Sequence, residues 1–148
     1  NRNKFDEVYS KELKRSKRYN NELSMIIFDI DDFKMVNDNY GHQIGDDVLK
    51  EIAKIILKNV REQDVNVRWG GEEFLILLPQ TNLAGAVTVA SKIRIAIKEH
   101  LFTPEILKIT ASFGVSQLLS EDSETTFISR GDNLLYEAKK TGKDKVIS

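Results

Sequence analysis

Apolar residues recur three and four positions apart in three segments of the chain, a spacing that gathers side chains on one face of an α-helix. This pattern predicts amphipathic helices at about residues 4–19, 45–60 and 82–99. The apolar positions are Phe5, Val8, Tyr9 and Leu13 in the first segment, Val48, Leu49, Ile52, Ile55, Ile56 and Val60 in the second, and Leu83, Ala86, Val87, Ala90, Ile93 and Ile97 in the third. We expect these side chains to form the core.

Strand patterns separate the helices. An almost unbroken apolar run predicts a central strand at about 23–30 that is buried on both faces. Two further runs, 65–69 and 73–78, predict a hairpin that ends at Pro79, because proline cannot donate to a sheet ladder. Apolar residues alternate with more polar ones at 107–115, which predicts a half-buried strand.

The remaining elements are shorter or bounded by turn residues. A short polar helix is expected at about 32–39, and a longer helix at about 125–140 ends at Gly142. Residues 145–147 predict a short edge strand. Thr81 is a candidate N-cap for the helix that follows it, because its hydroxyl can accept from a backbone amide. The order of strand, helices, hairpin, helix, strand and helix predicts an α/β sandwich with a mixed sheet.

The composition is that of one folded domain. The chain has 148 residues, 41% hydrophobic and 30% charged, which suffices for a single core. Its net charge of -1 provides no bulk attraction to nucleic acid or to an anionic membrane. It has no cysteine, which excludes disulfides and thiol catalysis, and no run of the roughly 18 apolar residues that a membrane helix needs. We expect a cytoplasmic domain that contacts neither nucleic acid nor membrane.

Gly70 and Gly71 lie between two of the predicted strands. Tight hairpin turns need positive φ, which glycine adopts without steric cost, so this pair predicts such a turn. Glu72 and Glu73 follow directly and would lie at its tip. By themselves, two carboxylates at an exposed turn are more typical of a solvated loop than of a site.

A second acidic cluster changes this interpretation. Asp29 lies at the carboxyl end of the central strand, where ligands usually bind, and Asp31 and Asp32 follow the strand. If the hairpin pairs beside this strand, Asp29 and one of the glutamates reach a single cation. Mg²⁺ is commonly held by one or two carboxylates together with substrate phosphates. The two clusters therefore predict a nucleotide site that uses Mg²⁺.

Several segments resemble the signatures of GGDEF domains, the catalytic domains of diguanylate cyclases, in order and spacing. They are residues 1–2, 29–38, 40–46, 68–74, 112–115 and 132–143. The resemblance extends over essentially the whole chain and implies a single domain over 1–148. It also implies a mixed, largely antiparallel five-stranded sheet flanked by helices, as in nucleotidyl cyclases and polymerase palm domains.

GGDEF domains condense two GTP molecules into cyclic di-GMP and release pyrophosphate. By resemblance, Asp29, Glu72 and the backbone carbonyl of Ile30 hold Mg²⁺, with Mn²⁺ as an alternative. Glu73 matches a second acidic position near the metal or the attacking 3′-hydroxyl. Because neighbouring side chains of a strand point to opposite faces, Glu72 and Glu73 reach one site only if the turn distorts the strand.

The resemblance also assigns substrate contacts. Lys34, Lys139 and Lys143 correspond to phosphate ligands, although each taken alone would be a solvated charge. The backbone amides around Phe33 would help to hold the triphosphate. At position 143 the family often carries arginine; lysine keeps the charge there but lacks the planar fork that a bidentate contact needs.

Asn37 and Asp46 match the pair that recognises guanine. A carboxylate can accept from guanine N1 and N2, a donor pair that adenine lacks, so Asp46 favours GTP over ATP. The alternative is that Asp46 merely stabilises the first turn of the following helix. His42 belongs to the same motif and is interpreted as structural.

Arg61 and Asp64 precede Gly70 by the offset of the family's product-inhibition site, and Lys92 is a candidate further contact. A guanidinium fork can bind a guanine edge or a phosphate there. A salt bridge at a helix end is the alternative explanation for the pair.

The resemblance sets expectations for partners as well. One domain holds one GTP, so catalysis requires two domains that face each other with two-fold symmetry. The chain starts without methionine inside the family's opening motif, so we expect a fragment of a longer protein with an upstream sensory or receiver module, in some parents membrane-anchored. The rival functions are a catalytically silent domain that senses or docks through GTP or cyclic di-GMP, and a cyclase that also accepts ATP. The retained acidic residues favour the active, GTP-specific enzyme.

Overall fold

The computed structural model describes residues 2–103 and 107–148. Its elements are α1 (Arg2–Tyr19), β1 (Leu23–Ile30), α2 (Phe33–Tyr40), α3 (His42–Asn59), β2 (Val65–Arg68), β3 (Glu73–Pro79), α4 (Leu83–Glu99), β4 (Ala111–Gln117), α5 (Glu124–Lys140) and β5 (Val146–Ile147). Within the described residues, no helix is both long enough and apolar enough to cross a bilayer.

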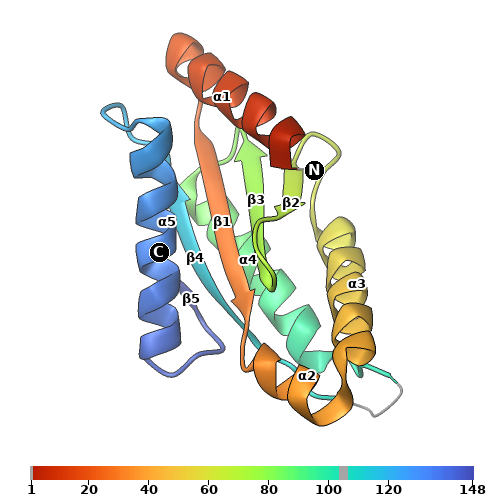
Figure 1. Cartoon of the computed structure of the whole chain (residues 1–148). Coiled ribbons are helices and arrows are strands. Elements are labelled where there is room, and N and C mark those ends of the chain that lie inside the picture. Colours follow the sequence, from red (N-terminus) through yellow and green to blue (C-terminus); the bar gives the residue numbers. More distant parts are fainter. Residues whose placement is uncertain (1, 104–106) are drawn as a thin grey trace.

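A five-stranded sheet in the order β2-β3-β1-β4-β5 runs through the middle of the molecule (Figure 1). The β1 strand pairs antiparallel with both β3 and β4, and β2 pairs antiparallel with β3. The β5 strand is parallel to β4. This arrangement confirms the predicted mixed, largely antiparallel sheet.

Both faces of the sheet are covered by helices. Ile26, Phe28 and Ile30 of β1 belong to one core cluster with apolar residues of α2, α3 and α4. Met25 and Ile27 belong to the other cluster, with residues of α1 and α5. Burial on both faces explains why β1 reads as an apolar run rather than as an alternating pattern.

Two glycines allow α5 to lie directly on β4. A Cβ atom added at Gly114 would lie 2.4 Å from the carbonyl oxygen of Gly131 and 2.6 Å from the amide nitrogen of Leu135. A larger residue at position 114 would push the helix off the sheet. This close contact brings the far end of α5 to the carboxyl end of β1.

The structure moves the predicted boundaries of α3 and β4. The α3 helix begins at His42 rather than near 45, because Gly41, with a φ of 90°, is the single residue between α2 and α3. The β4 strand spans Ala111–Gln117 rather than 107–115. Leu107 and Ile109 are buried in the core, but Leu107 pairs only in an isolated bridge with Phe102. The alternating pattern therefore extends back to residue 107 because Leu107 and Ile109 are buried in the core, although they do not belong to the β4 strand.

The predicted N-cap of α4 was wrong. Asn82, not Thr81, caps the helix, and its side chain accepts a hydrogen bond from the Gly85 amide at 2.8 Å. The Thr81 hydroxyl instead accepts from Nη2 of Arg61 at 2.6 Å. A tertiary contact thus takes the hydroxyl that the local sequence would assign to the cap.

The β2 strand ends one residue earlier than predicted, at Arg68.

Candidate active site

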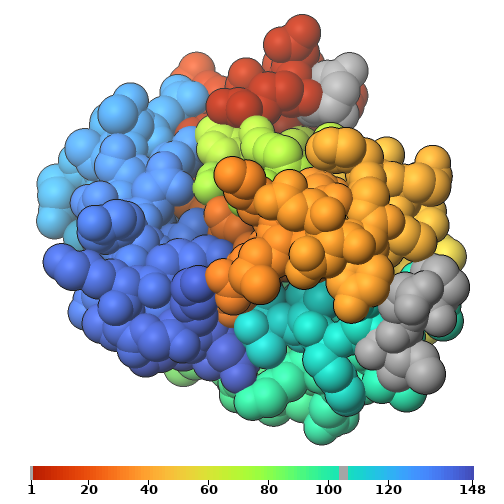
Figure 2. Space-filling view, turned by 60° about the horizontal axis from the view of Figure 1, so that its bottom comes forward, coloured from red at the N-terminus to blue at the C-terminus, as the bar shows by residue number. Residues whose placement is uncertain are grey.

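The predicted acidic residues meet at one end of the sheet. Figure 2 looks toward this end, which lies between the orange segment that includes α2 and the blue segment that includes α5. Asp29 is the Cα partner of Glu73 on β3 and of Ser112 on β4. Partners across antiparallel strands project to the same face, which here is the face that α5 covers. Glu72 lies just before β3, and its carbonyl accepts from the Ile30 amide at 3.3 Å. The hairpin therefore pairs beside β1, as expected.

The turn before β3 is irregular. The amides of Trp69 and Gly70 both donate to the Glu73 carbonyl, at 2.7 and 3.2 Å. Because β3 begins at Glu73, Glu72 belongs to the turn and the alternation of a strand does not separate the two carboxylates. Both interact electrostatically with Asp29, so the turn brings them to one site.

The predicted role of the two glycines in this turn was wrong. Neither Gly70 nor Gly71 has positive φ. The four residues between the strands make a wider loop than a two-residue turn, which removes the need for left-handed backbone. A Cβ atom at Gly71 would meet no atom within 4 Å. Glycine therefore leaves this backbone bare on its open side, where a ligand can approach closely.

Burial and like charge raise the pKa values of the carboxyl groups. Burial raises the pKa of Asp29 to about 6, with Lys139 opposing the shift and Glu72 adding to it. Burial raises the pKa of Glu73 to about 7, reinforced by the negative charges of Asp132, Asp29 and Glu72. Burial also raises the pKa of Asp132, an α5 residue whose proximity was not expected. A bound cation would relieve this concentration of negative charge.

Lys139 of α5 places a positive charge among the predicted metal ligands. Its Nζ lies 3.4 Å from Oδ1 of Asp29, 3.2 Å from the carbonyl oxygen of Ile30 and 2.8 Å from Oδ1 of Asp31. Two of the three predicted ligands thus already converge on one cationic centre. Within the described residues, no three His, Cys, Asp or Glu side chains are arranged to hold a metal by themselves. The predicted site needs only two carboxylates and a carbonyl, a donor set that suits Mg²⁺.

Asp31 is a residue whose role the sequence did not reveal. Its side chain is 2% exposed. It accepts hydrogen bonds from Thr110 Oγ1 and Ser112 Oγ, both at 2.7 Å, from Lys139 Nζ at 2.8 Å and from the amide of Asp144 at 3.0 Å. These bonds outweigh the effect of burial and lower the pKa of Asp31. Its place directly after a buried strand was the available signal.

The predicted phosphate ligands lie around the start of α2. Lys34 is exposed in the first turn of this helix, whereas the Phe33 side chain is buried and offers only its backbone amide. Lys143 donates to Oδ1 of Asp32 at 2.6 Å, so it reaches the same loop from the turn after α5. The structure therefore brings Lys34, Lys139 and Lys143 to the end of the sheet that carries Asp29.

Of the predicted guanine-recognising pair, Asn37 lies against the residue that precedes Asp46. Oδ1 of Asn37 lies so close to Gly45 that a Cβ atom there would be 1.9 Å away. Asp46 is the next residue and is exposed on α3. Because α3 begins at His42, Asp46 is not in its first turn, so the alternative role in stabilising that turn loses its basis. His42 is exposed, and its side chain makes no hydrogen bond or ion pair within the described residues.

The family comparison decides what kind of domain carries this site. The family model described as diguanylate cyclase, GGDEF domain, matches residues 1–145. The chain belongs to this family. The acidic turn between β2 and β3 is accordingly its GGDEF motif, with glutamate at the third position.

Relatives of this GGDEF domain include the response regulator PleD of Caulobacter vibrioides, 39% identical over 140 residues, which are 91% of this chain and 31% of PleD. A solved structure of the active GGEEF domain of a diguanylate cyclase from Vibrio cholerae is 36% identical, with a TM-score of 0.89 over 93% of this chain and 88% of that one. The GGDEF domain of DgcB from Caulobacter crescentus, in complex with c-di-GMP, is 26% identical, with a TM-score of 0.93 over 97% of this chain and 86% of that one. The chain spans about a third of the length of curated relatives such as PleD.

A second polar region of the GGDEF domain lies at the opposite end of β3. Arg61 contacts Asp64 through Nε at 3.3 Å and Nη2 at 2.9 Å, and Asp64 is buried. Nη2 of Arg61 also donates to the Pro79 carbonyl at 2.8 Å. The salt bridge expected as the alternative is therefore present, while the Arg61 side chain remains 46% exposed. Lys92 is exposed on α4, and within the described residues it makes no hydrogen bond or ion pair with Arg61 or Asp64.

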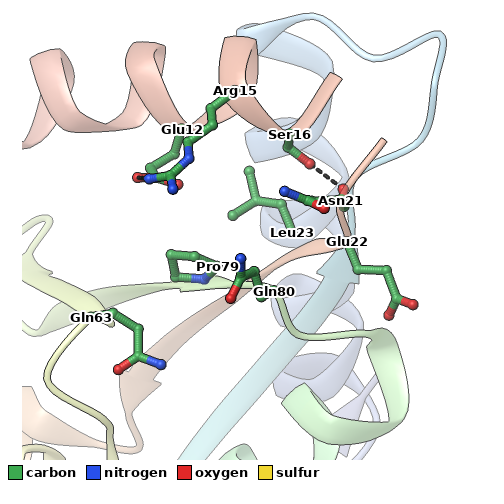
Figure 3. A pocket seen from close by; sticks show the side chains of 9 residues that line it. All are labelled: Glu12, Arg15, Ser16, Asn21, Glu22, Leu23, Gln63, Pro79 and Gln80. Atoms are coloured by element: carbon green, nitrogen blue, oxygen red, sulfur yellow. Dashed lines mark hydrogen bonds and ion pairs between the residues drawn. The ribbon is translucent and has the colours of Figure 1, made fainter. Parts of the chain in front are cut away.

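Hollows in the surface adjoin this region. One, of about 660 Å³, is lined by Asn20, Asn21, Glu22, Arg61, Gln80, Thr81, Asn82 and Gly85. A smaller pocket of about 140 Å³ lies beside it, between the end of α1 and Gln63 (Figure 3). The seven residues of β3 place this region about 20 Å from Glu73. It is thus distinct from the site at Asp29.

Proposed function

We propose that this domain is a diguanylate cyclase that condenses two GTP molecules into cyclic di-GMP and pyrophosphate in the cytoplasm. The observation that carries the proposal is the convergence of Asp29 and the Ile30 carbonyl on the Lys139 ammonium, beside the Gly-Gly-Glu-Glu turn that pairs Glu73 with Asp29. Family membership and relatives named as diguanylate cyclases support the same activity.

In this proposal Asp29, Glu72 and the Ile30 carbonyl hold Mg²⁺, or Mn²⁺ in its place. The bound ion supplies a Lewis acid that stabilises the charge that builds on the α-phosphate. Lys34, Lys139 and the amides at the start of α2 orient the triphosphate, so that most of the catalysis comes from positioning and electrostatics. Lys143 adds a phosphate contact as a point charge.

We assign proton acceptance from the 3′-hydroxyl to Glu73. In the metal-free domain its pKa is raised to about 7, chiefly by burial, which makes this carboxylate a better base than an ordinary glutamate. Its backbone position opposite Asp29 puts it beside the metal ligands. A general base must also lie within hydrogen-bonding reach of the proton that it removes, which the bare backbone of the adjacent turn permits.

Asn37 and Asp46 select guanine over adenine in this proposal. A carboxylate accepts from both guanine N1 and N2, a donor pair that the adenine of ATP lacks. We therefore expect turnover of GTP, with ATP excluded from the product.

Two domains must meet face to face, because each is proposed to bind one GTP and the product contains two new bonds. We infer that a homodimer of these domains is the catalytic unit and that an upstream sensory or receiver module brings the two copies together. Cyclic di-GMP is proposed to bind at Arg61, Asp64 and Lys92 and to inhibit synthesis. The exposed part of the Arg61 guanidinium and the adjoining hollow support this second site.

The decisive experiment is incubation of the purified chain with GTP and Mg²⁺, followed by mass spectrometry for cyclic di-GMP. We expect product from the wild type and none from Glu72→Ala. A matched control is Glu62→Ala, an exposed glutamate away from the acidic cluster, which should retain activity. If neither the isolated chain nor a fusion to a dimerising coiled coil makes product, while GTP or cyclic di-GMP still binds, the domain is the catalytically silent module instead.

A further inference from the structure

The turn after α5 is tied to α4 by a carboxylate. Asp144 accepts from Nη1 of Arg94 at 2.8 Å through Oδ1, and from Nζ of Lys98 at 2.7 Å through Oδ2. Arg94 and Lys98 are four residues apart on α4, so they present their charges on one side of the helix. Figure 2 shows the deep blue C-terminal segment bordering the blue-green surface that includes the end of α4.

The ion pair between Arg94 and Asp144 is partly shielded from solvent, whereas the Lys98 side chain is 54% exposed. The side chain of Asp144 is 23% exposed and that of Arg94 is 25% exposed. Partly buried pairs are screened less by salt than fully exposed ones. Lys143 and Asp144 both have positive φ, 61° and 47°, so the chain reverses sharply between α5 and β5. Two charged partners on one carboxylate hold this sharp turn in a single place.

The same turn reaches into the acidic site through its backbone. The amide of Asp144 donates to Oδ2 of Asp31 at 3.0 Å. Oδ1 of Asp31 in turn accepts from Lys139 Nζ at 2.8 Å. Lys139 is the residue that faces Asp29 and the Ile30 carbonyl. A continuous series of ion pairs and hydrogen bonds therefore runs from α4 to the predicted metal ligands.

Asp31 needs each of its donors because it is buried and charged. Thr110, Ser112, Lys139 and the Asp144 amide share its two oxygens. A buried carboxylate that loses a donor must rearrange its remaining partners to recover the lost interaction. Of these partners, Lys139 has the longest flexible side chain. A displacement of the turn after α5 therefore shifts the Lys139 ammonium group.

We propose that Asp144 is a positioning residue for GTP: it locks the turn after α5 to Arg94 and Lys98, and through Asp31 it sets the place of the Lys139 ammonium. The proposal rests on the proposed function, since it names GTP as the ligand of that site. The same turn carries Lys143, so Asp144 positions both lysines that α5 and its turn contribute to the triphosphate. It acts through other residues and touches no reacting atom itself.

The test uses Asp144→Asn on the whole chain. Asparagine keeps the backbone amide that donates to Asp31, and it tolerates a left-handed backbone. Its side chain is uncharged and has one acceptor oxygen for two cations. We expect the KM for GTP to rise about 3- to 10-fold while kcat changes less than about 2-fold, the range of a lost coupling between neighbours. Arg94→Met with Lys98→Met should reproduce this effect, and adding Asp144→Asn to that pair should change little further.

A second readout does not depend on catalysis. Reductive methylation of lysines in the ligand-free protein, followed by mass spectrometry, reports how firmly Lys139 is held. We expect Lys139 to react about 3-fold faster or more in Asp144→Asn than in the wild type, because a loosened ammonium is more accessible. Lys50→Met, which removes an exposed lysine of α3, is the matched control and should leave both readouts unchanged.

Each outcome decides the proposal. Faster labelling of Lys139 together with weaker binding of a non-hydrolysable GTP analogue supports it. Unchanged labelling overturns it, and so does faster labelling with unchanged affinity for the analogue. If Asp144→Asn does not fold, the Arg94→Met and Lys98→Met protein is judged by the same criteria. If the wild type neither binds GTP nor makes product, the proposed function fails, and the labelling result alone still decides whether Asp144 positions Lys139.

Discussion

At the scale of single residues, the candidate active site holds several carboxyl groups in surroundings that disfavour their ionised form. Asp29, Glu73 and Asp132 are carboxyl groups whose pKa values are raised, chiefly by burial. Lys139 opposes the shift at Asp29 but does not cancel the effect of burial on its pKa. Such clusters are typical of sites that are completed by a ligand, because a cation or a proton must supply the missing positive charge.

Glu73→Gln should stabilise the metal-free protein at alkaline pH. The folded-state pKa of Glu73, about 7, lies above the ordinary value of 4.5, so the folded protein binds the proton more tightly and loses stability as pH rises through this window. Glutamine does not ionise, so the variant does not lose this stability as the pH rises. We expect its free energy of unfolding in urea to exceed that of the wild type by roughly 1–3 kcal/mol at pH 8.5. At pH 4 the difference should vanish; an equal difference at both pH values would contradict the assignment.

At the scale of elements, the position of α5 on β4 decides whether the site exists. Asp132 and Lys139 belong to this helix, while Asp29 and Glu73 belong to the sheet beneath it. The helix can approach so closely because Gly114 leaves room for its backbone. A small separation of the two elements would remove Lys139 from the metal ligands without altering any residue of the acidic motif.

Gly114→Ala should therefore destabilise the fold strongly. Its Cβ would collide with backbone atoms of Gly131 and Leu135, which cannot turn aside as a side chain can. We expect a loss of about 1–3 kcal/mol or more, measured by urea unfolding. Gly71→Ala is the matched control, because a Cβ there meets no atom within 4 Å and its φ is not positive. A loss of the same size in both variants would contradict the argument.

At the scale of the whole molecule, the two candidate sites occupy opposite ends of β3. The acidic site is at Glu73, and Arg61 bonds to the carbonyl of Pro79 at the other end of the strand. A ligand at Arg61 therefore does not compete directly with GTP at Asp29 within one copy of the domain. Inhibition through the second site would have to act on the contact between copies or on the shape of the domain.

Arg61→Ala should relieve product inhibition without lowering the initial rate. The substitution removes the exposed guanidinium, while the backbone amide of residue 61 still donates to the buried Asp64 carboxylate, as in the wild type at 2.7 Å. We expect the cyclic di-GMP concentration for half inhibition to rise at least about 10-fold, since charge-assisted hydrogen bonds are the strong ones. The control is Lys54→Ala, an exposed cation of α3. Unchanged inhibition in Arg61→Ala would refute the assignment of the product site.

Activity per chain should rise with protein concentration, because a homodimer is the proposed catalytic unit. A dilution series at saturating GTP, with the oligomeric state followed by light scattering, measures this. Fusion to a dimerising coiled coil should remove the dependence by raising the effective concentration. A flat specific activity at dilutions where the chain is monomeric would rule out the dimeric mechanism.

The sequence alone determined the elements, their order and the motif residues, because helix and strand periodicities and the acidic pattern are local properties of the chain. It located Asp29, Glu72 and Glu73 and the family that carries them. Where burial or a distant partner competes with a local rule, only the tertiary structure decided the outcome. Arg61 took the Thr81 hydroxyl from the α4 cap, core burial at Leu107 and Ile109 imitated a strand, and the wider loop freed Gly70 and Gly71 from positive φ. Asp31 and Asp144 joined the site through contacts between residues far apart in the chain, as between Asp31 and Thr110 (79 residues) or Asp144 (113), and Asp132 joined it by lying near Glu73; no local pattern encodes such contacts.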